Sequence, residues 1–253
     1  LDLSGDDFIS EVQDAYLEML YDVNVDKEQA AYGVPYATNA SGVLYNEDLF
    51  AQAGVEVPKT WSEFQDVITK LEDAGITPFE FTFADSWTCL PPWNSMAPVI
   101  PAADFTDQRK EGKTTFVGTH EEILEKYLSL LDHAQDDFMG TTYTDGNAAF
   151  ANGSAAMMIN GNWAISEFLN TNPDMNVNMF AFPSVDDESK NTVTSGVDVL
   201  FAVSNQGSEE QQEAAKEFIR YALTKDVAQE YIDDQFAFSA VNGVEQQNET
   251  VSG

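Results

Sequence analysis

The chain has 253 residues, enough for one or two domains, and its 43% hydrophobic and 12% aromatic content is typical of a globular protein, not a disordered one. Eleven lysines and arginines against 44 aspartates and glutamates give a net charge of −33, which argues against binding to nucleic acid or to anionic membranes. The single cysteine excludes an internal disulfide and a zinc cluster, and no run of 18 apolar residues could cross a membrane.

The first third of the chain predicts a helix followed by strands. Residues 6–22 carry apolar side chains at helical spacing, which predicts an amphipathic helix. Residues 32–45 predict two short strands that flank a polar crossing at 38–42. The motif Asp22-x-Asn24-x-Asp26 resembles the start of a calcium loop, but lysine and glycine occupy positions that need glycine and glutamate. We therefore expect no calcium there.

Three capping boxes predict where later helices begin. They run from Thr60 to Glu63, from Thr119 to Glu122 and from Ser208 to Gln211, each followed by apolar residues at helical spacing. The helix after Thr119 would carry both histidines, His120 and His133, at its surface. Their separation of 13 residues fits no metal-ligand spacing, so we predict no metal site.

Strands are predicted between these helices. Residues 78–83 alternate phenylalanine with other residues, which predicts a half-buried strand, and short apolar runs follow at 155–159, 177–182 and 199–203. Interleaved helices and strands predict an α/β protein. No linker rich in proline or serine divides the chain, so any two lobes would share strands. Residues 85–113 are long for a plain connection and form a candidate binding loop.

Signals for catalysis and for cofactors are absent. The sequence contains no phosphate-binding loop, no dinucleotide fingerprint and no nucleophile elbow. Cys89 is expected to be a buried structural thiol. Among 44 carboxylates some pair will fit glycoside hydrolysis by chance, so that spacing has no specificity. We assign no catalytic residue and no cofactor, and we predict a binding protein and not an enzyme.

Aromatic residues in polar loops indicate sugar binding. Trp163 follows an apolar run and the turn Asn160-Gly161-Asn162, which places it at a strand end where open α/β sheets bind ligands. An indole offers a flat surface to the C–H face of a pyranose. Core packing is the alternative for Trp163. Trp87 and Trp93 lie in the candidate binding loop, and Trp61 is expected in the core.

Several blocks of the chain together resemble the bacterial extracellular solute-binding proteins of family 1, the sugar-binding subunits of ABC importers. The first is Gly33-Val-Pro-Tyr-Ala-Thr-Asn-Ala-Ser-Gly-Val-Leu-Tyr-Asn46, with residues 48–64 after it. The others are residues 150–163, 196–218 and 239–244, where Ser239 replaces a proline common in the family. They occur in the family's order.

The resemblance implies a two-lobed, periplasmic-binding-protein-like α/β fold of type II. Crossing strands would lie near 37–42 and 196–200. Residues 1–38 and 200–253 would form part of lobe 1, and residues 41–197 would form lobe 2. The family's opening strands and closing helices have no counterpart here, so we expect lobe 1 to be incomplete and the chain to be truncated at both ends.

The resemblance also implies ligand-binding residues. Trp163 matches a ring-stacking tryptophan, and Asn39 stands at the first crossing where a relative has a cleft glutamate. Asp85 and Trp87 fall on a polar and aromatic ligand loop. Asp198 lies on the second crossing and would face the cleft.

The implied function is an extracellular carbohydrate-binding receptor that closes its lobes around a mono- or oligosaccharide and delivers it to an ABC permease. The resemblance further implies a monomer that is a cell-surface lipoprotein or periplasmic. A secreted glycoside hydrolase, a sugar-binding module without a transport role and a receptor for a non-sugar solute are the alternatives.

Overall fold

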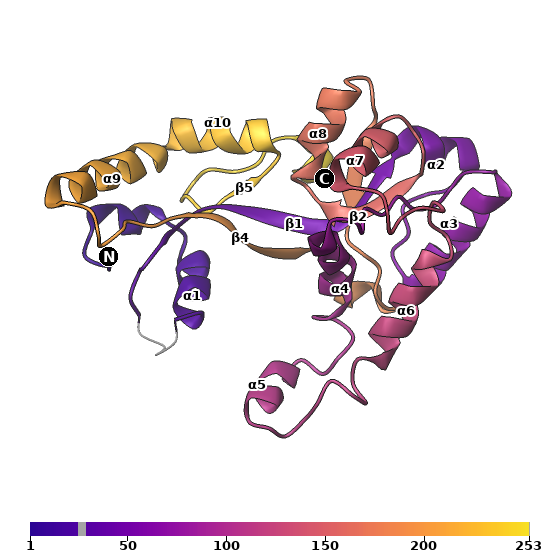
Figure 1. Cartoon of the computed structure of the whole chain (residues 1–253), viewed down its shortest axis with the longest axis horizontal. Coiled ribbons are helices and arrows are strands. Elements are labelled where there is room, and N and C mark those ends of the chain that lie inside the picture. Colours follow the sequence, from indigo (N-terminus) through magenta and orange to yellow (C-terminus); the bar gives the residue numbers. More distant parts are fainter. Residues whose placement is uncertain (25–28, 253) are drawn as a thin grey trace. The chain divides into compact units, whose positions relative to one another are not determined.

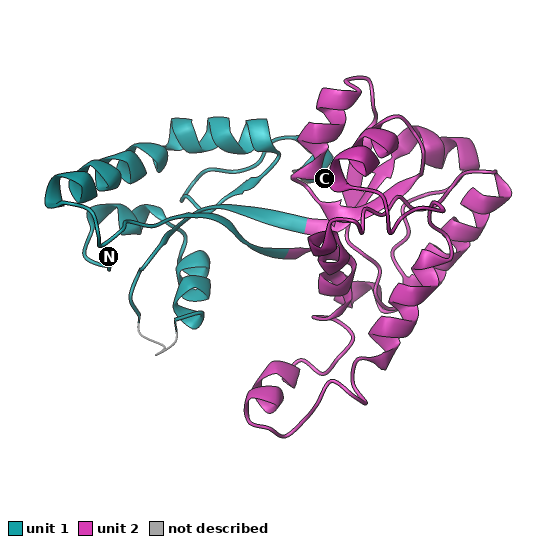
Figure 2. Ribbon diagram, viewed as in Figure 1, with its two compact units in different colours: residues 1–40, 195–253 teal, residues 41–194 magenta. Residues whose placement is uncertain are grey.

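The computed structural model describes residues 1–24 and 29–252 (Figure 1). The calcium-loop-like motif, at which we expect no calcium, runs into residues 25–28, so that expectation falls outside the described residues. The chain divides into two compact units, residues 1–40 with 195–253 (unit 1) and residues 41–194 (unit 2) (Figure 2). Strand β1 (Val34–Asn46) runs from unit 1 into unit 2, so the two units share one continuous strand.

Unit 1 places helices around the first half of β1. There β1 pairs with β4 (Thr194–Phe201) and, antiparallel, with the two-residue β5 through Ala37 and Ser239. Leu3, Val34, Ala240 and Val241 are fully buried in its core. The other elements are η1 (Asp7–Glu11), α1 (Asp14–Asp22), α9 (Glu209–Ala222), α10 (Lys225–Gln235), β5 (Phe238–Ser239) and α11 (Glu249–Ser252).

Unit 2 is built on an antiparallel sheet in the order β2-β1-β3. Val43 in the second half of β1 faces Ile159 on one side and Phe180 on the other. The core holds a dense group of phenylalanines, with Phe64 and Phe79 fully buried. Its elements are α2 (Glu47–Ala53), α3 (Trp61–Asp73), η2 (Ser86–Cys89), α4 (Leu90–Met96), α5 (Phe105–Lys110), α6 (Glu121–Leu131), α7 (Tyr143–Ala151), β2 (Met157–Gly161), α8 (Ala164–Thr171), β3 (Val177–Phe180) and η3 (Glu188–Lys190).

Two local predictions near the N-terminus are corrected by pairing between distant segments. The predicted helix over 6–22 is split into η1 and α1, because Val12 leaves the helical path to bridge Val241. The two strands predicted at 32–45 are one strand of 13 residues. Its polar centre stays extended because Thr38 pairs with Phe238 and Ser41 pairs with Gly161.

Residues 78–83 do not form the predicted half-buried strand. Phe79 makes only isolated bridges, and the intervening Glu80 and Thr82 are as buried as the phenylalanines. Side chains take the place of a partner strand here. The amide of Gln135 accepts from the backbone N–H of Phe81 at 2.9 Å, and the hydroxyl of Thr88 donates to the carbonyl of Thr82 at 2.7 Å.

Two of the three predicted capping boxes are confirmed, at Thr60 before α3 and at Ser208 before α9. The box at Thr119 is wrong. Helix α6 begins at Glu121, and the Thr119 hydroxyl donates back to the carbonyl of Thr115 at 2.8 Å.

The surface position predicted for His120 is wrong, because this residue is 4% exposed and its ring stacks on Trp93 with centroids 5.7 Å apart. His133 lies beyond the end of α6.

The buried carboxyl of Glu80 makes the stability of unit 2 depend on pH. It is 3% exposed and accepts hydrogen bonds from Gln135 at 3.0 Å and Ser154 at 2.7 Å. Burial raises the pKa of Glu80 above its usual value, although the bond from Ser154 opposes this. The folded chain therefore keeps a proton that the unfolded chain releases, and stability falls as pH rises through the folded-state pKa.

Glu80→Gln is expected to raise the melting temperature by about 2–4 °C at pH 7.5, because it removes the buried charge and keeps partners for both hydrogen bonds. The gain should shrink as the pH falls, because protonation of Glu80 in the wild type removes the same buried charge. Thermal denaturation between pH 4.5 and 7.5 measures this, with the exposed Glu56→Gln as the matched control. An equal loss of stability at every pH would contradict the prediction.

Candidate functional site

Trp163 lies two residues after the end of β2 (Gly161) and is the N-cap of α8, directly before Ala164. The strand ends at Gly161, and the half-buried indole folds back over this glycine. A Cβ atom built on Gly161 would lie 2.0 Å from the indole ring. The position of the indole therefore depends on the absence of a side chain at residue 161.

Trp163, Trp87 and Tyr143 form a group of rings that we call the aromatic corner. The ring centroids of Trp87 and Trp163 are 6.4 Å apart at 49°, and those of Trp87 and Tyr143 are 4.9 Å apart at 60°. Trp87 is 43% exposed and sits on the short turn η2. The corner thus combines a supported indole, Trp163, with one that is open to solvent.

Asp85 connects the segments that carry Trp87 and Tyr143 through two hydrogen bonds. Its carboxylate accepts the backbone N–H of Tyr143 at 2.6 Å, which joins the start of η2 to the start of α7. Its carbonyl also accepts the backbone N–H of Thr88 at 2.9 Å, which closes the turn that carries Trp87. Asp85 therefore positions both Trp87 and Tyr143.

A buried polar group lies against this corner, between helices α7 and α8. Asn147 is 2% exposed, and its amide N–H donates to the carboxylate of Glu167 at 2.7 Å. Burial raises the pKa of Tyr143 to about 12, opposed by the neighbouring Asn147 amide and Trp163 indole. The sequence reasoning missed Tyr143, Asn147 and Glu167. Their spacing in the sequence could have indicated them, because residues four apart, such as 143 and 147 or 163 and 167, lie on the same face of a helix.

The structure brings the other two predicted residues, Asn39 and Asp198, together within unit 1. The amide of Asn39 on β1 donates to the carboxylate of Asp198 on β4 at 3.2 Å. The backbone carbonyl of Asn39 accepts from the hydroxyl of Ser195 at 2.7 Å. Tyr231 lies nearby, and its pKa is raised by burial and by the charge of Asp198. The pair offers an amide and a carboxylate that can bind hydroxyl groups.

Within residues 1–24 and 29–252, no cluster of three or more acidic, histidine or cysteine side chains could hold a metal ion. Cys89 is half-buried, and burial raises the pKa of its thiol, which disfavours the reactive thiolate. No helix in this described part combines the length and apolar character that a membrane span requires.

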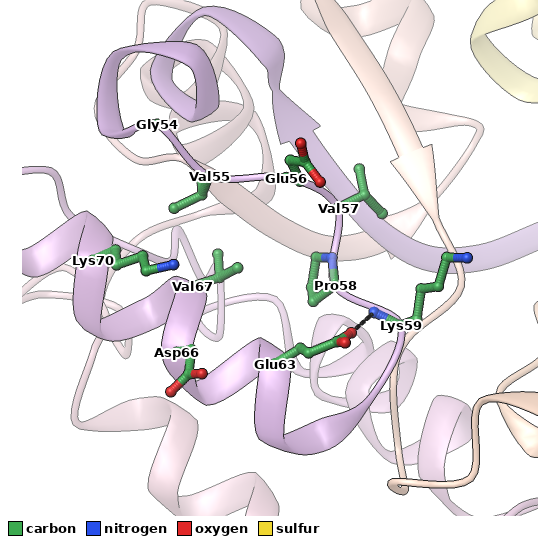
Figure 3. Close-up of a pocket in the computed structure, with 10 residues that line it drawn as sticks. All are labelled: Gly54, Val55, Glu56, Val57, Pro58, Lys59, Glu63, Asp66, Val67 and Lys70. Atoms are coloured by element: carbon green, nitrogen blue, oxygen red, sulfur yellow. Dashed lines mark hydrogen bonds between the residues drawn. The ribbon is translucent and has the colours of Figure 1, made fainter.

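A pocket of about 420 Å³ in unit 2, drawn in Figure 3, shares no lining residue with the aromatic corner. It is enclosed by the connection 54–59 and by one face of α3, and Glu63 accepts the backbone N–H of Lys59 at 2.7 Å. Its lining mixes valine, proline and charges of both signs, with no aromatic side chain. Because a sugar ring needs a flat apolar surface, the aromatic corner is the better candidate site.

The model of the bacterial extracellular solute-binding protein family matches residues 2–252, and the chain belongs to that family. This finding confirms the predicted resemblance. The chain is 28% identical over 251 residues to the multiple sugar-binding protein of Streptococcus mutans, covering 96% of this chain and 58% of that protein.

Solved structures agree with this assignment of the fold. The solute-binding protein RafE in complex with raffinose aligns with a TM-score of 0.83 and 27% identity, covering 99% of this chain and 65% of that one. A chitin oligosaccharide binding protein aligns with a TM-score of 0.80 and 26% identity, covering 92% and 59%. The predicted α/β, periplasmic-binding-protein-like fold is therefore confirmed, although the chain spans less than two thirds of these relatives.

Proposed function

We propose that the chain is the sugar-binding part of a receptor for an ABC importer, and that it binds a mono- or oligosaccharide without converting it. The observation that carries this proposal is the aromatic corner, in which the indole of Trp163 is held over Gly161 beside the exposed Trp87. A stacked indole buries the apolar face of a sugar ring, and nearby amides and carboxylates bind its hydroxyl groups. The names of the relatives that bind raffinose and chitin oligosaccharides support it.

The ligand-binding residues in this proposal are Trp163, Trp87 and Asp85 in unit 2 and Asn39 and Asp198 in unit 1. The two tryptophans would supply the stacking surface. Asn39 and Asp198 already exchange a hydrogen bond at 3.2 Å, so a sugar hydroxyl would add to a preformed polar pair. Asp85 would contribute through its remaining carboxylate oxygen.

The lobe assignment and the closing motion belong to the same proposal. Unit 1 would be part of lobe 1, and unit 2 would be lobe 2, with residues 37–42 and 196–200 as the crossings. A ligand that binds better to the closed form shifts the population towards it. Small-angle scattering with and without sugar tests this, since closure reduces the radius of gyration.

The partner and the location are proposals as well. Relatives carry the description of ABC transporter extracellular-binding or periplasmic-binding proteins, which supports a membrane permease as the partner. A monomer held at the cell surface by a lipid anchor, or one free in the periplasm, fits the expected role.

Isothermal titration calorimetry of the full-length receptor with raffinose, chitotriose and xylotriose tests the proposal. We expect at least one sugar to bind with micromolar affinity, which corresponds to about 8 kcal/mol. Unchanged sugar should be recovered at the end of the titration. Absence of heat with every saccharide would contradict sugar binding, and release of shorter products would favour the glycoside hydrolase.

A further inference from the structure

Two oxygen atoms at the aromatic corner are buried and lack a hydrogen-bond partner among the described residues. They are the hydroxyl of Tyr143 and the side-chain carbonyl oxygen of Asn147. Both belong to α7, one helical turn apart. Buried polar atoms are nearly always hydrogen-bonded, so two atoms without a partner beside the exposed Trp87 indicate that a group from outside the chain satisfies them.

The existing contacts of Tyr143 and Asn147 determine which chemical group could bind their two unpaired oxygen atoms. One N–H of the Asn147 amide is bound to Glu167 at 2.7 Å, whereas its carbonyl oxygen has no partner and needs a donor. The Tyr143 hydroxyl can donate or accept. A sugar hydroxyl does both, so one such group can serve both atoms.

The charge of the residues around these two atoms indicates whether the ligand is neutral or anionic. Asp85 is bonded to the backbone of Tyr143, and Glu167 is bonded to Asn147. None of the ion pairs among the described residues involves either carboxylate. An anionic sugar would meet two uncompensated negative charges, which disfavours its binding.

We propose that Tyr143 and Asn147 are specificity-determining residues that bind a hydroxyl group of a neutral saccharide stacked at the aromatic corner. Trp87 contacts the Tyr143 ring, is 43% exposed and lies on a four-residue turn. A small rotation of this exposed indole, which remains part of the stacking surface, would admit the sugar hydroxyl to the Tyr143 oxygen. This inference rests on the proposed sugar-binding function.

The test removes one oxygen atom and keeps the ring. Tyr143→Phe in the full-length receptor should weaken binding of the best neutral sugar by about tenfold, because one hydrogen bond to the ligand is lost. The melting temperature of the unliganded protein should change little, since the hydroxyl makes no hydrogen bond of normal geometry in the free state and has only the Asn147 amide and the Trp163 indole beside it. Calorimetry and thermal denaturation measure the two effects.

Tyr127→Phe is the matched control for stability. The Tyr127 hydroxyl donates to the carbonyl of Cys89 at 2.9 Å, so its removal should lower the melting temperature of the free protein. Tyr143→Phe behaving in the same way, with unchanged sugar affinity, would overturn the inference. That result would indicate that the hydroxyl serves the fold or an ordered water.

The anionic probe is trigalacturonic acid, titrated beside a neutral trisaccharide. We expect the neutral sugar to bind and the acidic one to bind at least tenfold more weakly. Equal or tighter binding of trigalacturonic acid would overturn the inference and leave the sugar-binding function intact. Absence of wild-type binding to every sugar would overturn the proposed function itself.

Discussion

Trp163→Ala is expected to weaken sugar binding by tenfold or more. The indole would bury a sugar face, an interaction on the order of 2 kcal/mol, and each 1.4 kcal/mol is about tenfold in affinity. Calorimetry of the full-length variant with the best wild-type ligand measures the loss. Folding should be retained, because the indole is only half-buried and rests on the backbone of Gly161.

Trp61→Ala is the matched control for Trp163→Ala. Trp61 starts α3 in the same unit and packs against Phe64 and Phe182, with the Lys126 ammonium 4.9 Å from its ring centroid. Its loss should lower the melting temperature and leave sugar affinity unchanged. Wild-type affinity in Trp163→Ala would remove Trp163 from the binding site.

Gly161→Ala is expected to reduce sugar affinity nearly as much as loss of the indole itself. The added Cβ would lie 2.0 Å from the Trp163 ring, closer than any van der Waals contact, so the indole has to move off the strand end. Its stacking surface would then leave the aromatic corner. Near-ultraviolet circular dichroism reports the moved indole, and calorimetry reports the lost affinity.

Gly5→Ala is the control for Gly161→Ala, because nothing lies within 4 Å of a Cβ at residue 5. It should leave both the dichroism spectrum and sugar affinity unaltered. A Gly161→Ala protein with the wild-type spectrum and wild-type affinity would show that the indole tolerates a side chain below it. The packing described for the corner would then be wrong.

Trp163 and Tyr143 show why the sequence reveals only part of the site. Trp163 follows an apolar run and a glycine turn, and both are local patterns that indicate a strand end. Tyr143 and Asn147 lie some 20 residues earlier along the chain. They reach the corner only because α7 packs on α8 and because Asp85 binds the backbone of Tyr143. The spacing of residues 143 and 147 indicates a shared helix face, but nothing local indicates the contacts of that face with α8 and with Asp85.

Residues close together in the chain determined the features that the sequence predicts by itself. The capping boxes at Thr60 and Ser208, the α/β alternation and the tryptophan after Gly161 depend on hydrogen bonds and periodicities within a few residues. Only the tertiary structure showed which residues pair with, or are buried by, segments that are distant in the sequence. Val12 leaves its helix to pair with Val241, and His120 is enclosed by the rings of Trp93, Phe105 and Phe116. The physical reason is that helix caps and helical or strand periodicity depend on hydrogen bonds between neighbouring residues. Burial and long-range strand pairing depend instead on how all the elements of a unit pack together.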